Sequence, residues 1–166
     1  MKLSVVERQI LWNQYEILKH LGVGGVKSSY EEMQKIIEHG YTAFYEDNII
    51  HMDKEEVSDE DFDLVTGTLR MFDQISQYET GNGKIDDHRA HFIGFDGNEE
   101  HTLQGIASFL IDVQKKWSFL NIESCNSHSP TAPMYRRMVE KWKTVGGANT
   151  RAQINEILAA GTYPSD

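Results

Sequence analysis

The stretch Ser58–Glu79, SDEDFDLVTGTLRMFDQISQYE, carries apolar side chains on two opposite faces of a helix. At about 100° per residue, one face holds Phe62, Val65, Leu69 and Phe72, and the other holds Leu64, Met71, Ile75 and Tyr78. A helix at a protein surface needs only one apolar stripe, so a helix with two is either central in its subunit or covered by another subunit. Both placements remain open from the sequence.

Signals for the start of a helix recur on both sides of this stretch. Capping-box patterns at Ser4–Glu7 and Ser28–Glu31 predict helices that run to about Leu21 and about Asp47. Three later helices are predicted to start at Asp96 or Asn98, at Pro133 and at Asn149, and to end near Leu120, Gly146 and Gly161. The one β-like stretch, HFIGF at 91–95, is too short and isolated to build a sheet. We therefore predict an all-α protein of about six helices, folded as one compact domain over residues 1–166.

The composition is that of an ordinary globular protein. Hydrophobic residues make up 39% of the 166 residues and charged residues 25%, a balance that argues against disorder. The N-terminal segment lacks the uninterrupted apolar run of a signal peptide, and no later segment has the length and apolarity of a membrane span. The lone Cys125 cannot form an intramolecular disulfide. We therefore expect a cytoplasmic protein that does not associate with membranes.

The net charge of −10 is concentrated in one segment. Nine acidic residues and one basic residue, Lys54, lie in the range 46–63, whereas the last third of the chain is mildly basic. A chain this acidic is a poor partner for a phosphate backbone, which argues against nucleic acid binding. The acidic segment 46–63 and the basic segment 115–143 are candidate complementary surfaces of two subunits. The simpler interpretation is that both segments face solvent.

The predicted first helix carries an amide inside its apolar stripe. The stripe consists of Val6, Ile10, Ile17, Leu21, Leu18 and Leu11. Gln14 falls between Leu21 and Leu18, and a buried amide without a hydrogen-bond partner costs about 1–3 kcal/mol. Gln14 is therefore either a paired core or interface residue or a group that recognises a ligand or partner. Its neighbours Asn13 and Tyr15 are candidates for the same recognition role.

The glycine-rich stretch Tyr78–Arg89, YETGNGKIDDHR, matches half of an EF-hand loop. With Gly83 at loop position 6, the second half fits, and Asp86 stands at ligand position 9. Position 1 is Tyr78, and position 12, which should be a bidentate Glu, is Arg89. A guanidinium in place of two carboxylate oxygens repels a cation. We therefore predict no calcium binding and interpret the glycines as a turn after the central helix.

Four segments spread along the chain together resemble a bacterial protein family, YfbU. They are ERQILWNQY at 7–15, IIEHGY at 36–41, FIGFD at 92–96 and APMYRRMVEKW at 132–142. The resemblance extends over most of the chain, and it implies a small, all-helical protein that forms oligomers and has no established biochemical function. It implies no catalytic residues. Phe95, within FIGFD, joins the candidate recognition residues of the first helix.

The densest set of titratable side chains lies beside the FIGFD segment. It consists of Asp86, Asp87, His88, His91 and Asp96. Acid–base or metal-assisted hydrolysis needs two carboxylates and a histidine that converge, and these five are the candidates for such a site. The simpler interpretation is that the two neighbouring aspartates cap a turn, that Asp96 caps the next helix, and that Arg89 pairs with an acid.

Two pairs of side chains have spacings that zinc ligands use: His88 with His91, and Cys125 with His128. The pairs lie far apart in sequence, and a structural zinc site needs about four ligands close together. We therefore predict no metal site and no cofactor.

The sequence lacks a complete catalytic set. Its patterns favour a self-associating module for protein interaction or regulation, with copies of the same chain or another protein as partners. The alternative is a small metal-dependent or acid–base hydrolase that uses residues 86–96.

Overall fold

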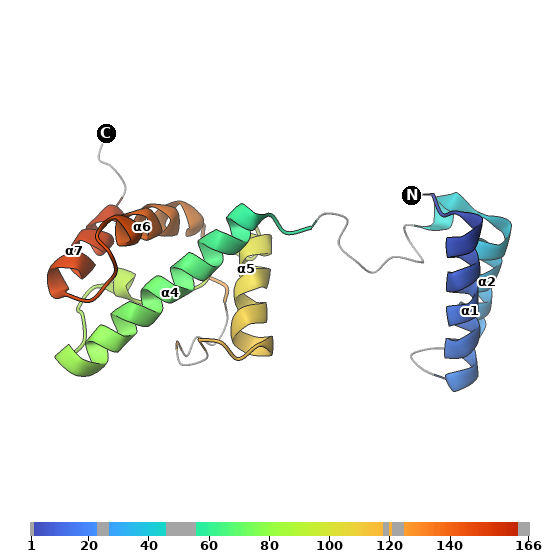
Figure 1. The fold of residues 1–166 in the computed structure, drawn as a ribbon, viewed down its shortest axis with the longest axis horizontal. Helices are drawn as coiled ribbons and strands as arrows, with labels where there is room; N and C mark the ends of the chain where they lie inside the picture. The colour runs from blue at the N-terminus through green and yellow to red at the C-terminus, as the bar shows by residue number, and fades with distance from the viewer. Residues whose placement is uncertain (1, 23–26, 46–55, 118–119, 121–124, 163–166) are drawn as a thin grey trace. The chain divides into compact units, whose positions relative to one another are not determined.

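The computed structural model describes residues 2–22, 27–45, 56–117, 120 and 125–162 (Figure 1). Six α-helices and three short helical segments make up most of this described part, which confirms the all-α prediction. The chain divides into two compact units, Met1–Glu56 and Val57–Asp166. A single domain over residues 1–166 remains a prediction.

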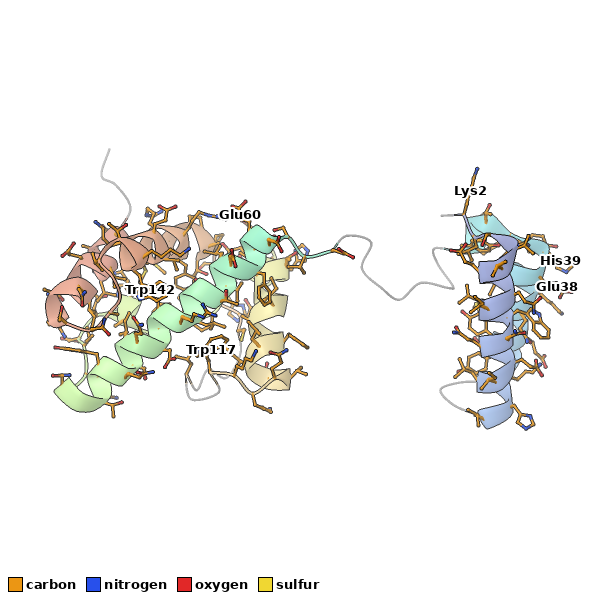
Figure 2. All side chains as sticks on the ribbon, viewed as in Figure 1. Lys2, Glu38, His39, Glu60, Trp117 and Trp142 are labelled. Atoms are coloured by element: carbon orange, nitrogen blue, oxygen red, sulfur yellow. The ribbon has the colours of Figure 1, made fainter. Side chains whose placement is uncertain are left out.

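The N-terminal unit is a hairpin of two helices, α1 (Val5–Leu21) and α2 (Lys27–His39). The predicted capping box starts α1. The Ser4 hydroxyl accepts from the Glu7 N–H at 3.2 Å, and the Glu7 carboxylate accepts from the Ser4 N–H at 2.7 Å. Gly22 follows the last turn with a left-handed φ of 66°, at the predicted stop. Side chains project from α1 both toward α2 and away from it (Figure 2).

The second helix ends before the predicted limit near Asp47, a residue that lies outside the described part of the chain. Gly40 follows α2 with a φ of 68°, and a short 3-10 helix, η1 (Thr42–Phe44), continues the chain. A left-handed glycine ends the ladder of helical hydrogen bonds. The predicted end was wrong because the prediction did not treat Gly40 as a stop.

A buried amide joins the two helices of the hairpin. The Nε2 of Gln34 in α2 donates to Glu16 Oε2 at 2.8 Å, and its Oε1 accepts from Lys19 Nζ at 3.3 Å. Glu16 and Lys19 also form an ion pair at 2.7 Å. Toward the N-terminal end of α1, the Arg8 guanidinium donates to the carbonyl oxygen of Ile37 at 3.2 Å. A buried amide with both of its groups paired fixes the register of α1 against α2.

The C-terminal unit is built around α4 (Asp59–Asn82). As predicted, the Ser58 hydroxyl caps this helix by accepting from the Asp61 N–H at 3.1 Å. Helices α5 and α6 contact α4, and α7 contacts α6 (Figure 1). The bounds of these three helices are His101–Ser108 for α5, Ala132–Thr144 for α6 and Arg151–Ala160 for α7.

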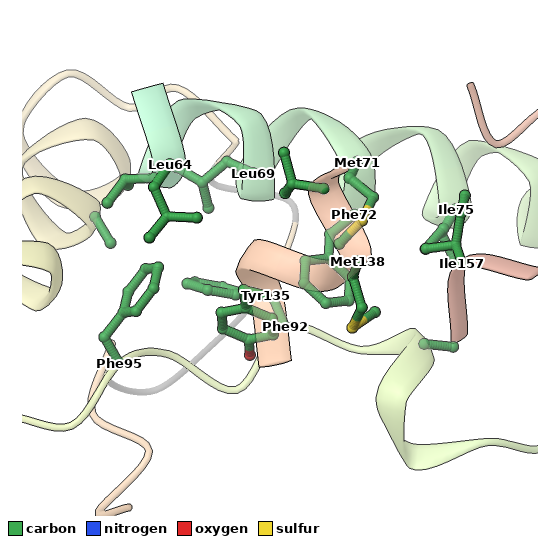
Figure 3. Close-up of a cluster of buried hydrophobic side chains, with 14 of the residues drawn as sticks. Leu64, Leu69, Met71, Phe72, Ile75, Phe92, Phe95, Tyr135, Met138 and Ile157 are labelled. Carbon is green, nitrogen blue, oxygen red and sulfur yellow. The ribbon is translucent and has the colours of Figure 1, made fainter. Parts of the chain in front are cut away.

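Most of both apolar faces of α4 is buried within this unit, which favours burial inside the subunit over the other placement that the sequence left open; Phe62, near the start of the helix, is 45% exposed. The buried residues are Leu64, Val65, Leu69, Met71, Phe72 and Ile75. Phe72 faces an aromatic cluster that also contains Phe92, Phe95 and Tyr135 (Figure 3). Tyr135 lies edge-on to both Phe72 and Phe95, with ring centroids 5.4 Å apart in each case. Edge-to-face contact is one of the arrangements that aromatic pairs prefer.

Helix α5, the fourth predicted helix, is shorter than predicted at both ends. Its N-cap residue is Glu100, whereas the prediction placed the start at Asp96 or Asn98. After Ser108 the backbone widens into a π-helical segment, η3 (Phe109–Val113), so α5 does not continue to Leu120. Apolar residues continue at helical spacing beyond Ser108, so the predicted helix was too long. A sequence pattern does not reveal where an α-helix changes to a wider turn.

The stretch HFIGF forms one isolated parallel β-bridge, between Phe95 and Asn126, and the described residues contain no β-strand. None of the helices in the described ranges has the length and apolarity needed to cross a membrane.

Candidate functional site

The most unusual surface of the hairpin is the side of α1 that α2 does not cover. None of the described side chains of α1 is buried. Four large aliphatic side chains on this side are at least half exposed: Val6 at 68%, Ile10 at 50%, Ile17 at 58% and Leu21 at 66%. Soluble proteins scatter exposed aliphatic residues singly, whereas these four share one stripe of one helix.

The candidate recognition residues of the first helix divide between its two sides. Asn13 and Gln14 are exposed, in the same stripe as the four aliphatic side chains. Tyr15 is half-buried against Tyr30, with ring centroids 6.1 Å apart, and burial raises the pKa of its hydroxyl. Asn13 Oδ1 accepts from Gln9 Nε2 at 3.0 Å. We call the surface formed by these side chains the α1 face; it consists of Val6, Ile10, Asn13, Gln14, Ile17 and Leu21.

The opposite side of α1 completes the hairpin. Leu11, Trp12 and Leu18 are half-buried there. The predicted stripe therefore splits, because Leu11 and Leu18 leave it for the side that faces α2. A cavity of about 370 Å³ opens on the hairpin, and it is lined by Val5, Arg8, Gln9, Trp12, Ile37 and Glu38. The Arg8 guanidinium in this cavity is bonded to the carbonyl oxygens at the end of α2, which makes it a group that holds the hairpin together.

Phe95, the fourth candidate recognition residue, is fully buried in the aromatic cluster of the C-terminal unit. The Tyr135 hydroxyl accepts from the Ile93 N–H at 3.1 Å, and burial strongly raises the pKa of this hydroxyl. The FIGFD segment is therefore anchored to α6 from inside the core. In this position, Phe95 contributes to packing.

Gly94 allows the FIGFD segment to approach residues 125–127 closely. Its φ is 95°, and a Cβ added to it would lie 2.4 Å from the carbonyl carbon and oxygen of Cys125. Phe95 N–H donates to the Cys125 carbonyl at 2.9 Å, and Ser127 N–H donates to the Phe95 carbonyl at 3.0 Å. A side chain on Gly94 would break this backbone contact.

Among the candidate hydrolytic residues, all of which lie in the described part of the chain, only the neighbours Asp87 and His88 make a direct contact, with Nδ1 of His88 3.8 Å from Oδ1 of Asp87. Asp87 makes a two-pronged ion pair with Arg89, with distances of 3.0 Å from Nε and 2.6 Å from Nη2. Asp96 is buried, and its carboxylate accepts from the Asn98 N–H at 3.0 Å. The remaining three candidates, Asp86, His88 and His91, are exposed. Within the described ranges, no three His, Cys, Asp or Glu side chains are grouped as metal ligands.

The EF-hand-like stretch has no loop where the ligands should lie. Helix α4 continues through Tyr78, Thr80 and Asn82, and Gly83 follows it with a φ of 88°. In the second candidate zinc pair, Cys125 is buried and His128 is exposed. Gly83 ends the helix, whereas Gly81 and Asn82, which the prediction placed in the turn, belong to the last turn of α4.

One carboxylate that sequence reasoning missed connects three segments of the C-terminal unit. Glu100 accepts from the Asp96 N–H at 3.0 Å, from the Thr131 N–H at 3.0 Å and from the Ala132 N–H at 2.8 Å. It therefore caps the start of α6 from the start of α5. Gln74 of α4 has a similar role, since its Oε1 accepts from Trp142 Nε1 at 2.7 Å. Neither residue stands in a local motif that would signal these contacts.

The acidic and basic segments meet at one point within the C-terminal unit. Arg136 Nη1 lies 2.6 Å from Glu60 Oε1, and both side chains are largely exposed. The acidic residues from 46 to 55 lie outside the described part of the chain. Docking of these two segments between subunits therefore remains a prediction.

Comparison with known proteins identifies the family. The model of the YfbU domain matches residues 1–160 of this chain. A UPF0304 protein, MJECS11, of Methanocaldococcus jannaschii is 37% identical over 166 residues, and the match covers 94% of this chain and 96% of that protein. The family match therefore includes residues of both compact units. The chain therefore belongs to the YfbU family.

Proposed function

We propose that this chain is a cytoplasmic, non-catalytic module that associates with copies of itself, and that it acts in protein interaction or regulation through that assembly. The observation that supports the proposal is the α1 face, which the hairpin leaves uncovered. A stripe of aliphatic side chains along a whole helix is typical of a surface that another helix covers.

The size of the apolar stripe supports the proposed association. Complete burial of one large aliphatic side chain contributes roughly 1.5–3 kcal/mol, and a symmetric pair of α1 helices would cover four such side chains from each copy. The side chains are about half to two-thirds exposed in the hairpin, so most of that contribution is still available. Association costs an estimated 4–15 kcal/mol in lost freedom of motion, and the contribution of the stripe is of the same order.

The contacts of the residues 86–96 segment support a non-catalytic role. Asp87 is held by Arg89, and Asp96 accepts from the backbone of its own turn. Burial of the Cys125 thiol raises its pKa, which disfavours the reactive thiolate. These groups stabilise local structure in the C-terminal unit.

A matched pair of substitutions tests the proposal. Ile17→Glu places a charge in the α1 face, whereas Val5→Glu makes the same kind of change at a position that is 71% exposed on another side of the same helix. We expect the unmodified chain and Val5→Glu to sediment as oligomers of the 19.0 kDa chain, and Ile17→Glu to sediment as a monomer. Circular dichroism checks that all three proteins keep the same helix content.

An unmodified chain that stays monomeric at tens of micromolar would contradict self-association. An Ile17→Glu variant with an unchanged oligomeric mass would show that α1 is not the surface involved. A non-catalytic role is tested separately, by thermal unfolding with added divalent metals. A large rise in melting temperature that Asp87→Asn and Asp96→Asn abolish would favour a metal-dependent hydrolase.

A further inference from the structure

We infer that two copies of this chain pair through α1 in antiparallel orientation, about a two-fold axis that passes between Asn13 and Gln14. The inference rests on the proposed self-association and adds the partner, the orientation and the register. It is carried by the order of side chains along the α1 face.

The α1 face presents the same kinds of side chain in the same spacing when it is followed in either direction. The order is aliphatic, aliphatic, amide, amide, aliphatic, aliphatic, at Val6, Ile10, Asn13, Gln14, Ile17 and Leu21. Ile10 and Ile17 are equally distant from the midpoint between the two amides, and Val6 and Leu21 are also equally distant from it. All six side chains are exposed in the hairpin.

A surface of this kind matches itself when one copy is reversed. In a two-fold symmetric dimer, the same patch of both subunits forms the contact. In an antiparallel helix pair, each residue lies at the same height as the partner residue that is equally far from the two-fold axis in the opposite direction along the sequence. Ile10 therefore packs against Ile17 of the partner subunit, and Val6 lies at the level of Leu21 of the partner subunit. Each aliphatic level of one helix meets an aliphatic level of the other.

The two amides occupy the one place where such a dimer needs residues that can pair with their own copies. At the axis, Asn13 lies beside Asn13 of the partner subunit, and Gln14 lies beside Gln14 of the partner subunit. An amide carries both a donor and an acceptor, so two copies of the same amide can hydrogen-bond to each other. A charged residue at this position would meet a like charge. Amides within an apolar seam also fix its register.

Charge and helix dipoles favour the antiparallel over the parallel orientation. In a parallel pair each residue meets its own copy, so Glu7, which flanks the α1 face, would lie at the level of Glu7 of the partner subunit. The antiparallel pair separates these two carboxylates by about 20 Å along the helix axis. It also places the positive end of each helix dipole beside the negative end of the other.

Cysteine cross-linking tests the orientation. The variants are Ile10→Cys, Ile17→Cys and the double variant, with the unmodified chain as the control for the buried Cys125. In the antiparallel dimer, the two copies of position 10 are about 10 Å apart along the axis, which is beyond the reach of a disulfide. We expect mild oxidation to cross-link the double variant into a covalent dimer and to leave both single variants uncross-linked.

The same samples separate failure of the orientation from failure of self-association. If both single variants cross-link as readily as the double variant, the helices pair in parallel and the inference is overturned. A dimeric mass with no cross-link in the double variant also overturns it, because self-association then uses another surface. A mass of 19.0 kDa for the unmodified chain and for all three variants overturns both this inference and the proposed function.

Discussion

Ile10 and Ile17 lie on the same exposed side of α1, about two helical turns apart, with Asn13 and Gln14 halfway between them. The two isoleucines are 50% and 58% exposed. The hydrogen bonds of Gln34 join α1 to α2 on the other side of the helix. The α1 face can therefore be changed by substitution without removing the contacts that form the hairpin.

Substitution of Gly94 will show how tightly the FIGFD segment is packed. A Cβ at this position would overlap the backbone of Cys125, and the φ of 95° is strained for any L side chain. We expect Gly94→Ala to lower the free energy of unfolding by about 3 kcal/mol. Chemical denaturation followed by tryptophan fluorescence measures the change.

Gly81→Ala is the matched control for that measurement. Gly81 lies within α4, and nothing lies within 4 Å of an added Cβ. Alanine there is expected to raise the free energy of unfolding by about 0.5–1 kcal/mol. Equal effects of the two substitutions would show that Gly94 does not approach Cys125 as described.

Glu100 is expected to be the most important carboxylate for the stability of the C-terminal unit. Glu100→Gln replaces a charged acceptor that receives three backbone N–H groups with a neutral amide. The expected loss is about 1.5–3 kcal/mol of unfolding free energy, the range for hydrogen bonds to charged groups. Glu99→Gln removes a charge from the neighbouring exposed residue and should change stability by less than about 0.5 kcal/mol. Similar losses in the two variants would contradict the role of Glu100.

The ion pair of Asp87 predicts a pH dependence at the acidic end. Hydrogen bonds from the Arg89 side chain lower the pKa of Asp87 from 3.8 to about 2. Because its pKa is lower in the folded than in the unfolded protein, ionised Asp87 stabilises the fold fully at pH values above its unfolded-state pKa. This stabilisation is lost as the pH falls through about 2. Asp87→Asn should therefore cost about 1–2 kcal/mol at neutral pH and almost nothing at pH 2. Asp86→Asn, at an exposed neighbour, should cost little at either pH; a constant deficit for Asp87→Asn would contradict this pKa.

Most helix starts were predictable because their signals are local. The capping hydroxyls of Ser4 and Ser58 each bond to an N–H three residues further along, so a short pattern contains the whole interaction. Helix ends were less predictable. The end of α2 depends on the left-handed conformation of Gly40, and the change after Ser108 to a π-helical segment has no sequence signature.

Contacts between distant segments account for what could not be predicted. Glu100 caps α6 across a separation of 31 residues from Thr131, and no local pattern encodes such a pairing. The position of Gln14 within the apolar stripe was predicted from the sequence, but its exposure in the hairpin was not. The predicted apolar stripe of the first helix was wider than the observed α1 face because it included Leu11 and Leu18. Periodicity does not show that these two residues belong to the side facing α2.

We propose that the chain self-associates through the apolar α1 face. Sedimentation equilibrium of the unmodified protein, at low and at high salt and over a range of concentrations, tests it most directly. We predict a mass of two 19.0 kDa chains that salt does not reduce, because burial of aliphatic side chains is not screened by ions. A monomer under all conditions, or an assembly that dissociates at high salt as charged docking would, contradicts the claim.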